Sequence, residues 1–223
     1  MPTIVISEFM DEAAIRDSLS GFDVLYDPKL VDDPPRLQAA LADARALIVR
    51  NRTQVRPALL AHAPQLECVG RLGVGLDNID VDACRARDVA VYPATGANDL
   101  SVAEYVITAA LVLLRRAWFA TGAVIDGQWP RMALIGREMS GRRLGLVGYG
   151  AIARETAARA RALGMTVSAY DPHLPAEHAA WRDAERVTLD DLLATADVVS
   201  LHVPLTNETR HMLDARALAR MKP

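Results

Sequence analysis

The sequence is poor in cysteine, in aromatic residues and in charge of a single sign. Only two cysteines, Cys68 and Cys84, occur in 223 residues, which is too few for a disulfide framework and fits a reducing compartment such as the cytoplasm. The 25 basic residues nearly balance the 28 acidic ones, for a net charge of −3. Such a surface has no overall attraction for nucleic acid or for an anionic membrane, so neither is expected as a partner.

Long hydrophobic runs are missing as well. The most apolar run, VITAALVLL at 106–114, is too short to span a bilayer and is typical of a buried helix. The N-terminal segment MPTIVISEFMDEA lacks a basic region followed by an apolar core, so it does not match a signal peptide. With 51% hydrophobic and 24% charged residues, the chain has an ordinary globular composition and a length for one large or two small domains.

Short apolar runs alternate with helix-like segments over the first hundred residues. The runs are TIVI (3–6), DVLY (23–26), ALIV (46–49), LECVG (66–70) and VAVY (89–92). Strands that alternate with helices indicate a mostly parallel sheet with helices on both faces. The sequence therefore predicts an α/β domain over residues 1–98.

A second α/β domain is expected over residues 99–223. A long apolar helix at 101–119, with Ser101 as N-cap and Glu104 as its capping-box partner, bridges the two domains. Strands are expected at 144–148, 166–170 and 197–203, with a helix at 151–164 between the first two. This is one mononucleotide-binding half plus one strand, and the second half of a doubly wound sheet is absent. We therefore expect a truncated chain whose C-terminal part is missing.

The segment between the strand at 144–148 and the helix at 151–164 matches G-x-G-x-x-A. Gly148 permits a tight turn, Gly150 lets the backbone approach a pyrophosphate, and Ala153 lets the helix pack close to the strand. Asp171 ends the next strand, where it can accept hydrogen bonds from ribose hydroxyls and repel a 2′-phosphate. The pattern predicts an NAD site; a plain βα corner with a capping Asp171, or an FAD site, are the open alternatives.

Five ordered motifs resemble the D-isomer-specific 2-hydroxyacid dehydrogenase family, in its phosphoglycerate-dehydrogenase-like branch. They are GRLGVGLDNID (70–80), SVAEYVI (101–107), GREMSGRRLGLVGYGAIA (136–153), YDP (170–172) and HVPLTNETRHML (202–213). The resemblance implies a flavodoxin-like substrate domain and an NAD-binding Rossmann domain with a cleft between them. It also implies hydride transfer between nicotinamide and C2 of a small D-2-hydroxy or 2-keto acid.

The resemblance assigns substrate contacts to the first domain. The backbone amides of Gly73, Val74 and Gly75 would hold the substrate carboxylate, since glycines allow a nest of N–H groups, and Val74 would also reach the cofactor. Arg50 matches a family arginine that faces the cleft and can pair with a carboxylate or a distal anion. Arg52 is a further candidate cation.

In the second domain, the resemblance implies cofactor contacts and no catalytic residue. The cofactor residues are Gly148, Tyr149, Gly150, Ala151, Ile152, Asp171, His202, Val203 and Pro204. His202 is assigned to the cofactor loop rather than to general-base catalysis. The family's catalytic arginine, glutamate and histidine would lie beyond Pro223, so the 223-residue chain alone is expected to be inactive, and no metal is expected.

Arg50 and Arg52 favour a substrate with a second anionic group, such as 3-phosphoglycerate or 3-sulfolactate. Glyoxylate or hydroxypyruvate reduction is the nearest alternative, and a non-enzymatic NAD sensor like the family's corepressor relatives is another. Family members commonly dimerise through the cofactor domain and the helix near 101–119, so a homodimer is expected; burial of that helix within one chain fits its apolar residues equally well.

Overall fold

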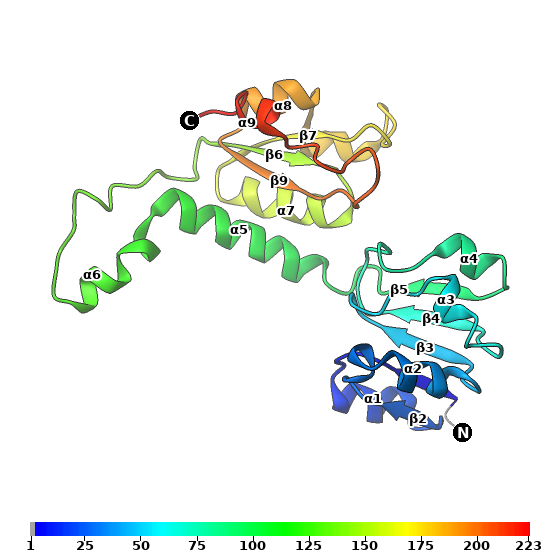
Figure 1. Ribbon diagram of the computed structural model, residues 1–223. Helices are drawn as coiled ribbons and strands as arrows, with labels where there is room; N and C mark the ends of the chain where they lie inside the picture. The colour runs from blue at the N-terminus through cyan, green and yellow to red at the C-terminus, as the bar shows by residue number, and fades with distance from the viewer. Residues whose placement is uncertain (1–2) are drawn as a thin grey trace. The chain divides into compact units, whose positions relative to one another are not determined.

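The computed structural model describes residues 3–223 as two compact α/β units. The first unit ends at Ala97, and the second runs from Asn98 to Pro223. Each unit contains one sheet in which every strand pair is parallel (Figure 1). A parallel sheet brings the carboxyl ends of its strands to one edge, and ligands of such folds bind at that edge.

The first unit has five strands in the order β2-β1-β3-β4-β5. The strands are β1 Ile4–Ile6, β2 Val24–Tyr26, β3 Ala46–Val49, β4 Cys68–Arg71 and β5 Ala90–Pro93. The helices are α1 Glu12–Leu19, η1 Leu30–Asp32, α2 Pro34–Leu41, α3 Pro57–Leu60 and α4 Val81–Arg85. This strand order is that of a flavodoxin-like sheet, so the predicted fold class is confirmed for this unit.

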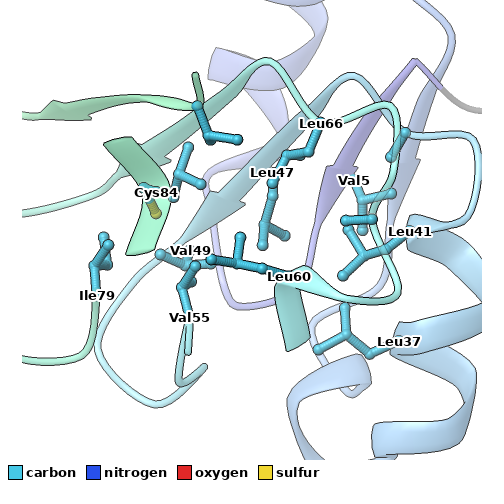
Figure 2. Close-up of a cluster of buried hydrophobic side chains, with 14 of the residues drawn as sticks. Val5, Leu37, Leu41, Leu47, Val49, Val55, Leu60, Leu66, Ile79 and Cys84 are labelled. Carbon is cyan, nitrogen blue, oxygen red and sulfur yellow. The ribbon is translucent and has the colours of Figure 1, made fainter. Parts of the chain in front are cut away.

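The core of the first unit lies between its sheet and its helices. Val5 of β1 and Leu47 of β3 are fully buried, and Leu41 of α2 and Leu60 of α3 pack against them (Figure 2). Aliphatic side chains packed this densely leave the strands little freedom. The loops at the carboxyl edge therefore start from a rigid base.

The second unit has four strands in the order β8-β7-β6-β9. The strands are β6 Arg143–Val147, β7 Thr166–Tyr170, β8 Glu185–Arg186 and β9 Val198–Leu201. The helices are α5 Asp99–Arg115, η2 Ala117–Ala120, α6 Thr121–Ile125, α7 Ala151–Ala162, η3 Ala179–Asp183, α8 Leu189–Thr195 and α9 Ala215–Leu218. Counted from β6, the order is 3-2-1-4, as in a Rossmann sheet. Helices α5 and α7 lie on one face of the sheet and α8 and α9 on the other (Figure 1).

The helix expected at 101–119 has different bounds in the structure. It starts at Asp99, because the amide of Val102 donates to the carbonyl of Asn98 (3.0 Å). Ser101 therefore lies inside the first turn and cannot be the N-cap, so that prediction was wrong. The helix ends at Arg115, since Arg116 adopts a left-handed φ of 57°; a non-glycine residue in this role gives no sequence signal.

Helix α5 packs against α7. Its residues Ile107 and Ala110 belong to the buried core of the second unit, to which α7 also contributes. Among the described residues, no single helix is long and apolar enough to cross a membrane; α5 and the η2–α6 segment, bent by 59°, reach that length and composition only together.

Candidate functional site

The turn after β6 contains two glycines with different surroundings. The fold requires glycine at position 148, whereas the space in front of Gly150 is open. Gly148 has a φ of 88°, and a Cβ there would lie 2.8 Å from the carbonyl oxygen of His202, so only glycine fits. Gly150 has a φ of −75°, and a Cβ there would meet no protein atom within 4 Å. The space in front of Gly150 is where the predicted pyrophosphate would approach.

Helix α7 begins directly behind this turn. Gly150 is its N-cap and offers no side chain to the first-turn amides. Ala153 is fully buried against the sheet, which allows the helix to approach β6 closely. Free amides and the positive end of the helix dipole make such an N-terminus suited to a phosphate.

Asp171 is tied to the glycine turn by its carboxylate. One oxygen accepts a hydrogen bond from the amide of Tyr149 (2.8 Å), and the other accepts from the amides of His173 (2.9 Å) and Leu174 (3.2 Å). A carboxylate offers about four acceptor sites, so capacity for a ribose hydroxyl remains. The three amides fix the orientation in which that hydroxyl would be received.

A pocket of about 340 Å³ opens at the carboxyl ends of β6, β7 and β9. It is lined by Gly148, Gly150, Tyr170, Asp171, Pro172, His173, His202, Val203, Pro204, Thr206, Glu208, Thr209 and Met212. Of the nine residues of this unit that the sequence assigned to the cofactor, six are in this lining, and Tyr149, Ala151 and Ile152 are not. The pocket lies at the edge of the sheet where dinucleotides bind in this topology.

The side chain of Tyr149 is turned into the protein. It is 1% exposed and stacks on Trp181, with ring centroids 5.3 Å apart. Burial raises the pKa of the Tyr149 hydroxyl. Tyr149 therefore acts on the pocket through its backbone amide, which holds the carboxylate of Asp171. The sequence pattern alone does not show whether its amide or its side chain has this role.

His202 is held as part of the pocket wall. Its amide donates to the carbonyl of Val147 (2.7 Å), and its Nε2 lies 3.0 Å from the hydroxyl of Ser200. Burial lowers the pKa of the His202 imidazole below its ordinary value of 6.5. A neutral imidazole near pH 7 suits a packing role beside a nucleoside.

Sequence reasoning missed the residues that shape the loop after His202. Thr209 donates from its hydroxyl to the carbonyl of Pro204 (2.6 Å) and accepts from the amide of Thr206 (2.8 Å). These bonds close the loop around the pocket. The signal was present in the motif HVPLTNETRHML, of which only the first three residues were used.

In the first unit, the loop Leu72–Gly75 leaves two amides available. The amide of Leu72 donates to the carbonyl of Val49 and that of Gly73 to the carbonyl of Arg71, both at 2.9 Å. Within the described part of the chain, the amides of Val74 and Gly75 have no protein acceptor. Of the three loop amides that the sequence assigned to a substrate carboxylate, two are therefore available, those of Val74 and Gly75.

Gly73 has a backbone conformation that favours glycine, and the side chain of Arg71 lies against it. Its φ is 151°, and a Cβ there would overlap the guanidinium of Arg71. The Nε of Arg71 is buried without a hydrogen-bond partner among residues 3–223. Arg71 was not among the predicted site residues, although it stands in the first family motif.

Two arginines leave the sheet at the same edge. Arg71 pairs in register with Val49, and Arg50 follows Val49 directly. Arg50 is exposed, and its guanidinium lies 5.9 Å from the ring centroid of Phe9. Arg52, the further candidate, is instead paired with Asp32. Of the two arginines in the turn after β3, Arg50 is thus the one without a carboxylate partner among residues 3–223, and this turn lies at the same edge of the sheet as the Val74–Gly75 loop.

Each unit thus contributes one kind of binding surface. The second offers a pocket suited to a dinucleotide and a turn suited to a phosphate, and the first offers cations and amides suited to an organic anion. Within residues 3–223, no three His, Cys, Asp or Glu side chains come together as metal ligands.

Comparison with known proteins gives one family match and close relatives. Residues 107–223 match the family described as D-isomer specific 2-hydroxyacid dehydrogenase, NAD binding domain. The chain is 58% identical, over its whole length, to (S)-sulfolactate dehydrogenase of Chromohalobacter salexigens, of which it spans 72%. Over 86% of its length it is 44% identical to D-3-phosphoglycerate dehydrogenase of Mycobacterium bovis, of which it spans 37%.

The fold is also similar to that of a solved structure that contains bound NAD. D-lactate dehydrogenase from Aquifex aeolicus, complexed with NAD and lactic acid, superposes with a TM-score of 0.83 and 25% identity over 98% of this chain and 66% of its own.

Proposed function

Since this chain belongs to the D-isomer-specific 2-hydroxyacid dehydrogenase family, we propose that its protein is an NAD-dependent oxidoreductase for small D-2-hydroxy acids with a second anionic group. The reaction is hydride transfer between the nicotinamide of NAD and C2 of a 2-hydroxy or 2-keto acid. The preferred substrate class is a three-carbon acid with a 3-sulfonate or 3-phosphate, with 3-sulfolactate first.

The observation that carries this proposal is the state of Arg50. Its guanidinium is exposed and lies against the ring of Phe9, in the turn that follows β3, while the available amides of Val74 and Gly75 follow the neighbouring strand β4. The amides suit the C1 carboxylate, and the guanidinium suits a second anion, which it can bind through two parallel hydrogen bonds. The 58% identity to a sulfolactate dehydrogenase over the whole chain supports the sulfonate.

The stereochemical label of that relative agrees with a D-specific family. In lactate the carboxylate ranks above the methyl carbon, so the D isomer is (R). In 3-sulfolactate the carbon that bears sulfur ranks above the carboxylate, which exchanges the two priorities. The (S) isomer of sulfolactate therefore has the D arrangement at C2, and one site geometry serves both acids.

NAD is the cofactor of this family's binding domain, and the pocket at Gly148, Asp171 and His202 fits it. The open space at Gly150 and the α7 N-terminus suit the pyrophosphate, and Asp171 suits the adenosine ribose. NAD supplies the hydride acceptor, and the residues of this chain bind and orient it. No residue among 3–223 is assigned as the acid–base catalyst.

We further propose that the protein is a homodimer in the cytoplasm. Six large apolar side chains that follow α5 are at least 64% exposed: Trp118, Phe119, Ile125, Trp129, Met132 and Ile135. They lie on an apolar arm, residues 117–135, that runs away from the sheet of the second unit (Figure 1). Apolar surface of this extent favours burial against a second copy, and the two free thiols fit a reducing compartment.

A substrate panel tests the proposed function. The protein that contains this chain is assayed for NADH formation with 3-sulfolactate, 3-phosphoglycerate, D-lactate and glycerate, and for NADH oxidation with glyoxylate and hydroxypyruvate. We expect the highest kcat/KM with a dianionic acid, and Arg50→Ala is expected to lower that value more than the value for D-lactate. A preference for glyoxylate or hydroxypyruvate would contradict the second-anion assignment. Tight NAD binding without turnover would favour the sensor function.

A further inference from the structure

Glu8, at the end of β1, is a buried carboxylate inside a turn of the substrate unit. It is 4% exposed, and one of its oxygens accepts hydrogen bonds from the amides of Arg50 and Thr53, both at 2.9 Å. The other oxygen accepts from the amides of Asn51 (3.2 Å) and Arg52 (3.0 Å). Four consecutive amides of the turn that follows β3 thus converge on one side chain.

The charge state of Glu8 agrees with this arrangement. Burial raises its pKa, but the backbone hydrogen bonds from Thr53, Arg50 and Arg52 together outweigh burial and hold the pKa below its ordinary value. The carboxylate is therefore ionised at neutral pH, and its charge is spread over four N–H dipoles.

Because the four amides of the turn donate to Glu8, the turn can contact an anionic group of a substrate only through its side chains. A run of four convergent amides resembles an anion-binding nest, but Glu8 already fills it. Of the two arginine side chains in this turn, Arg50 remains available to a second anion of the substrate, because Arg52 is paired with Asp32. The direction in which Arg50 leaves the turn is fixed by the backbone that Glu8 holds.

Phe9 fixes the other end of Arg50. The guanidinium carbon lies 5.9 Å from the centroid of the Phe9 ring, a distance at which a cation is attracted to an aromatic face. Phe9 is 63% exposed, so burial in the core does not account for its place. Two consecutive residues, Glu8 and Phe9, therefore hold the backbone and the head of one arginine.

The same buried network reaches the loop of the carboxylate-binding amides. The hydroxyls of Ser7 and Thr53 lie 2.9 Å apart, and Asn78 donates from its side chain to the carbonyl of Thr53 (2.8 Å). Asn78 lies three residues after Gly75 and is 1% exposed. The turn that carries Arg50 and the Val74–Gly75 loop are thus joined within one unit.

We propose that Glu8 and Phe9 are positioning residues that aim Arg50 at the second anionic group of the substrate, and so set the preference for dianionic over monoanionic 2-hydroxy acids. The proposal rests on the proposed function, since it takes Arg50 as a substrate contact. Neither residue touches the reacting atoms.

The test is a comparison of 3-sulfolactate with D-lactate in the protein that contains this chain. Glu8→Gln is expected to raise KM for 3-sulfolactate about tenfold, with kcat and the KM for D-lactate nearly unchanged. Phe9→Leu is expected to give about a threefold rise, and Phe9→Trp to restore the wild-type value. In an Arg50→Ala background, Glu8→Gln should add no further loss. Equal losses on both substrates, or additive losses in the double variant, would overturn the proposal.

A control and a second measurement separate the positioning role from folding and from the proposed function. Glu67→Gln removes a carboxylate that pairs with Arg45 at 2.7 Å, at the opposite, amino edge of the same sheet, and is expected to change neither KM. Hydrogen exchange of the amides 50–53 is expected to speed up in Glu8→Gln and not in Glu67→Gln. Unchanged exchange would overturn the positioning role whatever the substrate. Faster exchange with no enzymatic turnover in the wild type would instead refute the proposed function.

Discussion

The carboxylate of Asp171 accepts a hydrogen bond of 2.8 Å from the backbone amide of Tyr149. The acid that follows β7 is thereby joined to the glycine turn that follows β6, 22 positions earlier in the chain. Asp171 holds the turn in this arrangement, and in the proposed NAD site its remaining acceptor capacity would receive the ribose. We therefore expect a substitution at Asp171 to weaken the binding of both the ribose and the pyrophosphate of NAD.

Asp171→Ala is predicted to weaken NAD binding and to narrow the discrimination against NADP. Loss of hydrogen bonds to a charged group costs about 1.5–3 kcal/mol, which corresponds to a rise in the Kd for NAD of about 10- to 100-fold. The Kd for NADP should change less, because the repulsion of its 2′-phosphate is lost at the same time. Isothermal titration with both cofactors measures this. Asp190→Asn, which removes an exposed pair with Arg220, is the control and should leave both values unchanged.

Gly148→Ala and Gly150→Ala are predicted to separate stability from cofactor binding. At Gly148 a Cβ would meet the His202 carbonyl at 2.8 Å in a left-handed conformation, so we expect a loss of about 2 kcal/mol in the free energy of unfolding. At Gly150 a Cβ meets no protein atom, so Tm should stay close to that of the wild type. The Kd for NAD should nevertheless rise at least about tenfold, because the methyl group stands where the pyrophosphate approaches. A Gly150→Ala protein that binds NAD normally would contradict the placement of the phosphates.

His202 is predicted to titrate below pH 6.5, because burial lowers its pKa. The unfolded chain binds this proton first as the pH falls, so the stabilisation due to neutral His202 is present above pH 6.5 and is lost as the pH falls through the folded pKa. Relative to His202→Gln, the wild type should lose free energy of unfolding over that interval in urea titrations. An NMR titration of the imidazole gives the folded pKa directly, and a value above 6.5 would refute the burial argument.

Substitutions on the apolar arm are predicted to dissociate the protein. Ile125→Ser combined with Trp129→Ser removes two side chains that are 78% and 79% exposed, so it should leave the fold of the monomer intact. Sedimentation velocity should then detect monomer at concentrations where the wild type is a dimer. Phe22→Ser, at a position 57% exposed in the first unit, is the control. A wild-type protein that sediments as a monomer would refute the proposed dimer.

Sequence patterns predicted the parts of the fold that depend on short-range regularities. The run ALIV coincides with β3, because four apolar residues between polar flanks are typical of a short buried strand. The turn Gly148–Ala153 was recognisable because each of its positions has its own steric requirement. Strand β8 was missed, since two exposed residues, Glu185 and Arg186, carry no pattern.

The parts of the candidate site that escaped prediction depend on contacts between distant residues. Glu8 binds amides 42–45 positions away, and no local spacing reveals a carboxylate that fills a remote turn. Arg71 was overlooked because an arginine within a strand pattern is ordinarily solvated, whereas here it lies against Gly73. In both cases the residue type was visible in the sequence and its partner was not.

Hydride transfer from a 2-hydroxy acid to NAD is tested directly by following the C2 hydrogen of the substrate. The protein that contains this chain is incubated with NAD and 3-sulfolactate deuterated at C2, and the reduced cofactor is analysed by mass spectrometry. We expect NADH that carries one deuterium, formed faster than from C2-deuterated D-lactate. NAD bound in the pocket without transfer of deuterium from any 2-hydroxy acid of the panel would contradict it.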